Sequence, residues 1–133
     1  LPLRTVFTDR KTLRQHSSAA LWPLGDNPIQ LEGFELHHGR TTASASCQQL
    51  CSESELGWVK RVGDAGGVVA GTYLHGVFES GPWRRRWLNQ LRTQKGLPLL
   101  SEQQPHHSRQ REALLDRLAD AFEEHINLEP LLR

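Results

Sequence analysis

The chain has 133 residues, enough for one domain with a hydrophobic core. Its 16 basic residues nearly balance 15 acidic ones, so the net charge of +1 gives no argument for a nucleic acid or an acidic membrane surface as partner. No apolar run approaches the roughly 20 residues of a membrane span, and Arg4 and Asp9 interrupt any signal peptide. We therefore expect a cytoplasmic globular domain.

The sequence contains no methionine and opens directly on "LPLRTVF" (1–7), which predicts a β-strand. A chain that starts inside a core element is typical of a piece of a longer protein. We expect residues 1–133 to be such a piece; an ordinary processed N-terminus is the alternative.

The next predicted strand is "IQLEGFEL" (29–36), in which apolar and polar residues alternate imperfectly. Gly33 within it indicates a bulge or close packing. The Ser- and Thr-rich residues 41–56 lack a clear period and predict a loop, with at most a short helical turn. Two further strands and the turn between them predict a hairpin: 57–62, 63–67 and 68–74.

After His75 the pattern becomes helical. Ser80 is a suitable N-cap, Pro82 fits the first turn, and Gly96 stops the helix. The arginines at 84–86 are expected on its solvated face, with nucleic-acid binding a weak alternative. The opposite face is apolar: Trp83, Trp87, Leu88 and Leu91.

Residues 97–107 read as a linker, and Ser108 is the predicted cap of a second helix. Its apolar face comprises Leu114, Leu115, Leu118, Phe122 and Ile126. An order of strands first and helices last suits either an α+β domain or the tail of an α/β sheet.

No metal site is predicted. Cys47 and Cys51 lie four residues apart, but no second pair of ligands has zinc spacing to them, and they form no disulfide framework. His37 and His38 would point to opposite faces of a strand and could not easily share an ion. The pair at 106–107 reads as part of a solvated linker.

His75 stands apart because it follows an apolar strand and precedes Gly76, a loop and a capped helix. Catalytic groups of α/β enzymes collect at the carboxyl ends of strands, and an imidazole suits acid–base chemistry near neutral pH. No Gly-x-Ser-x-Gly elbow supplies a nucleophile. The pattern alone leaves open whether His75 is catalytic or an ordinary strand-end residue.

Two motifs resemble one family. "LEGFELHHGRT" (31–41) is similar to the Gly-Tyr-Glu-Ile-His-x-Gly segment of the cobyric acid synthase family, and "GVVAGTYLHGVFES" (67–80) to its Gly-Thr-Tyr-Leu-His-Gly-Leu-Phe segment. The resemblance covers essentially the whole chain. It implies an α/β fold, the C-terminal portion of a flavodoxin-like class I glutamine amidotransferase domain with strands first and two helices last. The nucleophile-bearing segment and an N-terminal synthetase domain would lie outside residues 1–133.

The resemblance also implies a function: glutamine-dependent amidation of corrinoid side-chain carboxylates in cobalamin biosynthesis. ATP and Mg²⁺ would act at the N-terminal domain of the full enzyme, and this piece would bind no cofactor. The implied partners are glutamine, the corrinoid substrate and the remainder of its own polypeptide. The isolated piece would be free to self-associate.

In the resemblance, His75 takes the place of the catalytic histidine, which serves a cysteine thiolate that attacks the glutamine amide. The orienting glutamate of triad amidotransferases would fall at Val77, so another group must hold the ring. The further candidates for the glutamine site or for support of the ring are Glu35, His37, Tyr73 and Gly76. Glu35 and His37 are expected to share a cleft with His75.

The nucleophile is the departure from the family pattern, since neither Cys47 nor Cys51 matches it, and the isolated chain is expected to be inactive. The runner-up family is cobyrinate a,c-diamide synthase; Thr72 before Tyr73, and Gly76 after His75, favour cobyric acid synthase. A non-catalytic interaction module of the same fold is the alternative of a different class.

Overall fold

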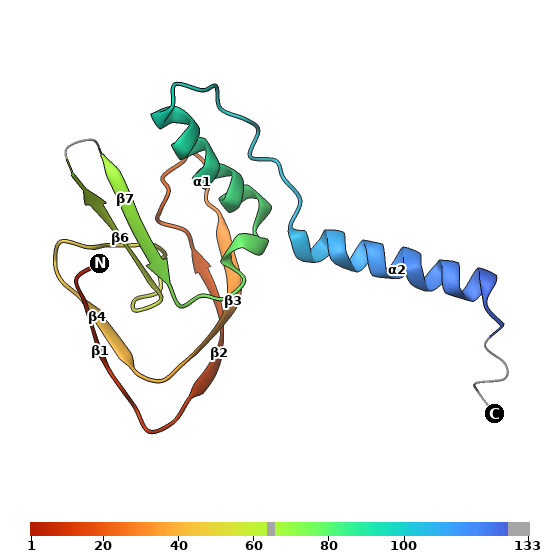
Figure 1. Cartoon of the computed structure of the whole chain (residues 1–133), viewed down its shortest axis with the longest axis horizontal. Helices are drawn as coiled ribbons and strands as arrows, with labels where there is room; N and C mark the ends of the chain where they lie inside the picture. Colours follow the sequence, from red (N-terminus) through yellow and green to blue (C-terminus); the bar gives the residue numbers. More distant parts are fainter. Residues whose placement is uncertain (64–65, 128–133) are drawn as a thin grey trace.

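The computed structural model describes residues 1–63 and 66–127. Strands come first and helices last, which confirms the expected mixed α/β class (Figure 1). The strands form one body with α1 against it, whereas α2 extends away from that body (Figure 1). The elements are β1 (Leu3–Val6), β2 (Thr12–Ala19), β3 (Gln30–His37), β4 (Arg40–Ala43), β5 (Gln48–Gln49), β6 (Gly57–Val62), β7 (Gly67–Thr72), the 3₁₀ turn η1 (Val77–Glu79), α1 (Gly81–Gln94) and α2 (His107–His125).

The strands pair antiparallel throughout the described residues. β2 pairs with β3 from Thr12↔His37 to Ala19↔Gln30, and β1 pairs with β4. β5, β6 and β7 form a three-stranded sheet, which confirms the predicted β6–β7 hairpin. Of its predicted turn at 63–67, residues 64–65 lie outside the described part. Two isolated bridges join the β2–β3 pair to the rest: Ala20↔Cys51 and Phe34↔His75.

The prediction of a loop at 41–56 was wrong, because this segment contains most of β4, all of β5 and the bridge at Cys51. β2 was not predicted at all. Its sequence, "TLRQHSSA", is polar on both faces and mostly exposed, so it carries no apolar alternation.

The core lies between the sheets and α1. Cys51 belongs to it with no exposed surface, and its Sγ contacts the Glu53 carbonyl oxygen at 3.7 Å. A flexible position for Cys51 is thereby excluded. Each fully buried large apolar side chain contributes about 1.5–3 kcal/mol. The buried apolar residues are Trp22, Ile29, Leu31, Leu50, Cys51, Leu56, Trp58, Val59, Leu74, Val77 and Trp83.

α1 follows its predicted signals. The Ser80 side chain caps the helix by accepting a hydrogen bond from the Trp83 backbone N–H at 3.4 Å, and Pro82 lies in the first turn. The Trp83 ring is buried, and its Nε1 donates to the Trp22 carbonyl at 2.9 Å. This bond fixes the helix on the strand body.

Arg86 corrects the expectation that 84–86 form a solvated face, because it is only 4% exposed. The chain after α1 folds back and brings Glu102 onto its guanidinium, with Nη2 2.7 Å and Nε 3.0 Å from Oε2. Nη2 also donates to the Asn27 carbonyl at 2.8 Å. A buried guanidinium requires such partners, since an unpaired buried charge is costly.

α2 begins at His107, and its N-cap is His106 rather than the predicted Ser108; no side chain caps it. None of its residues is buried. The predicted apolar face exists but is open to solvent, with Leu114 62% and Phe122 49% exposed. No helix in the described ranges has the length and apolar character to cross a membrane.

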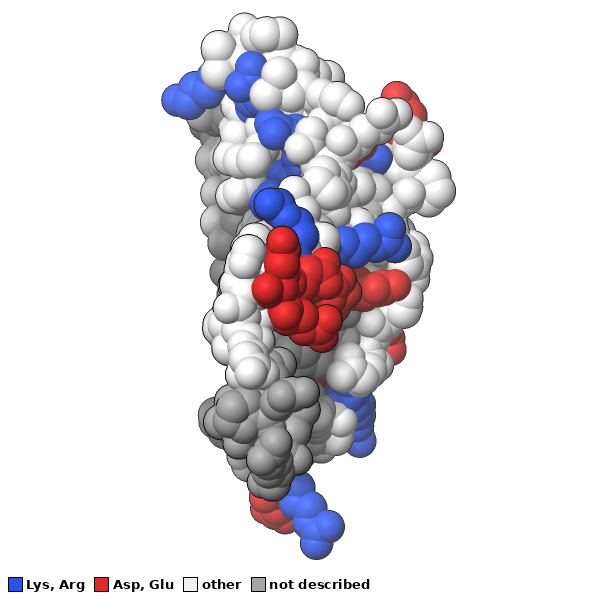
Figure 2. Space-filling view, turned by 90° about the vertical axis from the view of Figure 1, so that its right-hand side faces the viewer, with Lys and Arg blue, Asp and Glu red and all other residues white. Residues whose placement is uncertain are grey.

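The side of the molecule toward which α2 extends carries both signs of charge. Figure 2 shows acidic side chains gathered in the middle of this face, with basic side chains beside and above them. Neither sign covers the face alone, so this view offers no extended basic footprint of the kind that binds nucleic acid.

Candidate functional site

His75 lies where the chain leaves one strand partner for another. β7 ends at Thr72, and the Tyr73 N–H still donates to the Leu56 carbonyl at 2.8 Å, beside β6. Two residues later the His75 N–H donates to the Phe34 carbonyl at 2.8 Å, and the Phe34 N–H donates back at 3.2 Å. The backbone of His75 is therefore held to β3 by a reciprocal pair of hydrogen bonds.

Gly33 makes this close approach possible. A Cβ at this position would lie 2.0 Å from the His75 carbonyl oxygen and 3.0 Å from Leu74 Cδ1. A Cβ cannot lie 2.0 Å from the His75 carbonyl oxygen, so β3 needs a glycine at position 33, next to Phe34. Of the two readings of Gly33 from sequence, the structure shows close packing.

The imidazole of His75 is exposed and stacks on the Phe34 ring, with centroids 4.8 Å apart and planes 7° from parallel. Directly opposed residues of an antiparallel pair project to the same face, which brings these two rings together. Its ring nitrogens make no hydrogen bond to any described residue. Gly76 follows at φ +87°, a left-handed conformation that suits glycine and turns the chain into η1.

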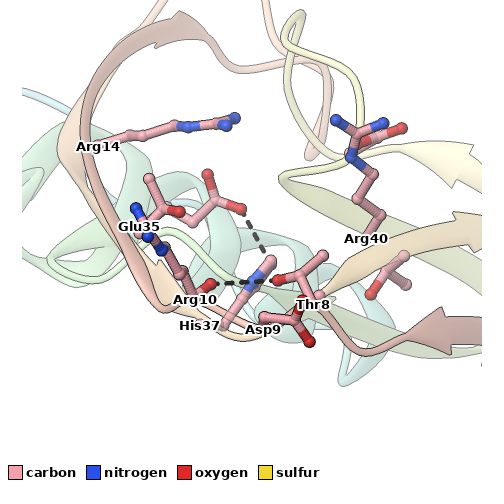
Figure 3. A pocket seen from close by; sticks show the side chains of 11 residues that line it. Thr8, Asp9, Arg10, Arg14, Glu35, His37 and Arg40 are labelled. Atoms are coloured by element: carbon pink, nitrogen blue, oxygen red, sulfur yellow. Dashed lines mark hydrogen bonds and ion pairs between the residues drawn. The ribbon is translucent and has the colours of Figure 1, made fainter.

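Glu35 and His37 lie on the other face of β3. They line a polar pocket of about 380 Å³ beside the β2–β3 pair (Figure 3). In this view the Arg14 and Arg40 guanidinium groups stand on one side of the pocket, above Glu35 and His37. The pocket lining is Thr8, Asp9, Arg10, Thr12, Arg14, Glu35, His37, Gly39, Arg40, Thr41 and Glu55.

Glu35 is the centre of a charged cluster. Its Oε2 lies 3.1 Å from His16 Nε2, and its Oε1 lies 3.0 Å from His37 Nε2. The second nitrogen of His16, Nδ1, lies 2.9 Å from Glu53 Oε2. The His37 contact has the distance of an ion pair without the angle of a hydrogen bond, so both of its ring nitrogens are buried without a hydrogen-bond partner.

Tyr73 connects this cluster to the strands around it. Its ring meets the edge of His37 at a centroid distance of 4.0 Å and 90°. Its hydroxyl lies 2.9 Å from Thr41 Oγ1, which in turn lies 2.8 Å from Thr5 Oγ1. Tyr73 thus faces His37, whereas His75 faces Phe34.

The structure does not bring Glu35 and His37 into a common cleft with His75. Side chains alternate across a strand, and His75 pairs with Phe34, the neighbour of Glu35 that points the opposite way. The expectation that Glu35 and His37 lie on the same face of one strand was correct. The expectation that His75 lies on that face as well was wrong.

The residues around Glu35 that sequence reasoning missed come mainly from β2 and its flanks. Arg14 is directly opposite Glu35, and His16 is its diagonal neighbour. The only sequence signal for these residues is the spacing of Thr12, Arg14 and His16 at every second position. This spacing places them on one face of a strand, but it points to Glu35 only once β2 is known to pair with β3. Arg10, Arg40 and Glu53 carry no such signal.

No group of three or more His, Cys, Asp or Glu side chains within 1–63 and 66–127 is arranged to hold a metal ion. Nor does either cysteine reach His75 as a partner: Cys47 is half-buried, and Cys51 is enclosed in the core. The candidate site therefore consists of an imidazole on one face of β3 and a charged pocket on the other.

Residues 1–83 match the CobB/CobQ-like glutamine amidotransferase domain. The chain belongs to this family. The match includes both segments that meet at Gly33, Phe34 and His75. The fold described above for residues 1–63 and 66–83 is therefore the fold of this portion of a glutamine amidotransferase domain.

The curated relatives agree along nearly the whole chain. It is 75% identical over 135 residues to the cobyric acid synthase of Synechococcus sp. (strain CC9311), covering 99% of this chain and 27% of that protein. It is 48% identical over 136 residues to the cobyric acid synthase of Prochlorococcus marinus (strain MIT 9313), covering 99% and 26%. The chain thus spans about a quarter of the length of these relatives. No solved structure matches it.

Proposed function

We propose that this chain supplies the catalytic histidine, His75, for ammonia release from glutamine in a cobyric acid synthase. The ammonia would amidate corrinoid side-chain carboxylates that ATP and Mg²⁺ activate in another domain of the same polypeptide. The observation that carries the proposal is an exposed imidazole on a backbone fixed at both its N–H and its carbonyl. Support also comes from relatives of 75% and 65% identity that are cobyric acid synthases.

The geometry suits proton transfer. The Phe34 ring covers one face of the His75 imidazole, and the ring nitrogens at its edge stay free of described partners. A thiolate approaching that edge could be kept deprotonated, and the same nitrogen could deliver its proton to the departing ammonia. Because Cys51 is enclosed and Cys47 is half-buried, we assign the thiolate to another segment of the polypeptide.

The pocket around Glu35 and His37 opens on the face of β3 opposite His75, so it is not assigned to the glutamine whose amide would react at His75. Glu35, His37 and Tyr73 are instead proposed to support the strands behind His75, with the Tyr73 ring in edge contact with His37. Gly76 supports the site by turning the chain after His75.

The deciding experiment uses a full-length cobyric acid synthase that carries this sequence. His75→Asn is expected to lower glutamine-dependent amidation by about 10²–10⁴-fold, the usual contribution of a general acid–base group. Amidation with ammonium salts should be unchanged, since it bypasses the imidazole. The matched control is His125→Asn, because His125 is exposed on α2.

Each outcome has a distinct meaning. Equal loss of glutamine-dependent and ammonia-dependent amidation would assign His75 a folding role. Unchanged activity with both nitrogen sources would overturn the proposal and favour a non-catalytic module.

A further inference from the structure

The ring of His75 must be held by something other than a carboxylate. Val77, which stands where a triad glutamate would be, is a core residue only 5% exposed. Glu79, the nearest acid that follows in the chain, is engaged elsewhere, with its Oε2 3.2 Å from His107 Nδ1. Glu35 points to the opposite face of β3. Thus no carboxylate in the described residues forms a hydrogen bond or an ion pair with the imidazole.

We propose that Phe34 is the positioning residue of His75 and holds the plane of its ring by parallel stacking. The inference rests on the proposed catalytic role of His75 and names how that role is prepared. Two constraints act together: the reciprocal backbone bonds fix the Cα of His75, and the stacked ring restricts rotation of the imidazole about its side-chain torsions.

Stacking differs from a hydrogen bond in what it leaves free. A triad glutamate occupies one ring nitrogen, whereas Phe34 covers a face and leaves both nitrogens available at the edge. Phe34 is itself 37% exposed, so its ring lies at the surface where a reacting partner could approach. Gly33 beside it keeps the His75 backbone close enough for the rings to meet.

The first test is structural and does not require catalysis. Proton NMR of the 133-residue chain with labelled histidine should show the ring protons of His75 shifted upfield by the Phe34 ring current, relative to the urea-unfolded chain. His75→Asn assigns the signals. Phe34→Leu should return them to the unfolded position, and Phe34→Tyr should keep the shift.

The control is Phe7→Leu, which removes an equally large ring that is 82% exposed, and it should leave the His75 signals in place. If the wild-type signals show no upfield shift, the stacking does not exist in solution and the proposal is overturned. This result does not depend on whether Phe34→Leu folds.

The second test measures orientation in a full-length cobyric acid synthase that carries this sequence. Phe34→Leu should lower kcat for glutamine hydrolysis by about 10-fold with little change in KM, because small misplacements of a catalytic group lower the rate steeply. Phe34→Tyr should restore kcat, and ammonia-dependent amidation should be unchanged in both variants.

The two proposals can fail separately. If His75→Asn has no effect on glutamine hydrolysis, the catalytic role itself is wrong. If His75→Asn abolishes hydrolysis but Phe34→Leu leaves kcat unchanged, His75 is catalytic and the positioning role of Phe34 is overturned. A loss of ammonia-dependent amidation in Phe34→Leu would also overturn it, as a general folding defect.

Discussion

The hydrogen atom that Gly33 carries in place of a side chain decides whether His75 can pair with β3. Position 33 does not need glycine for a left-handed backbone, because the φ angle of Gly33 is not positive. It needs glycine because the His75 carbonyl occupies the space of a Cβ, 2.0 Å away. A residue with no functional group thus controls the placement of the candidate catalytic residue.

Gly33→Ala is therefore expected to destabilise the chain. Because the clash is with backbone, the segment carrying His75 must move, and overpacking of this kind costs about 1–3 kcal/mol. Urea unfolding would show the loss as a lower transition midpoint. The control is Gly71→Ala, whose added Cβ meets only the flexible Leu1 Cδ1, at 3.2 Å. Equal midpoints for the two variants would contradict the close approach.

Among the elements, the two helices differ in what defines their beginnings. α1 starts at a buried Ser80 whose hydroxyl caps it, and Trp83 then fastens it to Trp22. α2 starts after His106 with no capping side chain and has no buried residue. The first helix is an integral part of the domain; the second depends on its own backbone hydrogen bonds.

Ser80→Ala should consequently lower the free energy of unfolding by about 1 kcal/mol, the usual effect of losing an N-cap. Ser108→Ala should cause no loss, because Ser108 lies inside α2 and alanine is the better helix former. Thermal unfolding of both variants, followed by circular dichroism, makes the comparison. A larger loss for Ser108→Ala would mean that the sequence-based cap at this position was correct.

What could be predicted from sequence follows from how local the signals are. α1 was predictable because Ser80, Pro82 and Gly96 act within a few residues of the helix ends. β2 was not, because its polar sequence becomes a strand only through pairing with β3. Arg86 is buried because the chain after α1 folds back and brings Glu102 to its guanidinium. The pattern of apolar residues along α1 does not reveal this contact.

The candidate site divides in the same way. The exposure of His75 and the turn at Gly76 could be predicted from the strand-to-helix pattern around them. The face on which His75 lies could not, because it is set by the partner residue Phe34, which lies 41 positions earlier in the sequence. Glu35 and His37 were correctly placed together and incorrectly placed with His75.

At the scale of the whole molecule, no cysteine in the described residues forms a hydrogen bond with the His75 imidazole. We expect the isolated chain to show no glutaminase activity, because amide attack needs a thiolate within roughly 2.6–3.2 Å of the imidazole. Cys51 has no exposed surface. A coupled assay for glutamate release should detect turnover only in the full-length relative. Turnover by the chain alone that disappears in Cys47→Ser would show that the nucleophile was misassigned.

The open apolar face of α2 predicts self-association of the isolated chain. Contiguous apolar surface of this kind is uncommon on soluble monomers, and Leu114, Leu118 and Phe122 are each about half exposed or more. Sedimentation velocity should show a weight-average mass that rises with concentration. Leu118→Gln with Phe122→Gln should suppress the rise, whereas the exposed polar change Gln110→Ser should not. A constant monomer mass for the unmodified chain would contradict the prediction.

The bridge between Phe34 and His75 also has a consequence for solvent access to the backbone. Because each residue donates its amide proton to the other, neither proton can exchange with water unless the β2–β3 pair separates from the end of β7. The two amides should therefore exchange deuterium at one common rate, slower than that of the exposed residues of α2. That rate reports how readily the backbone of His75 separates from β3.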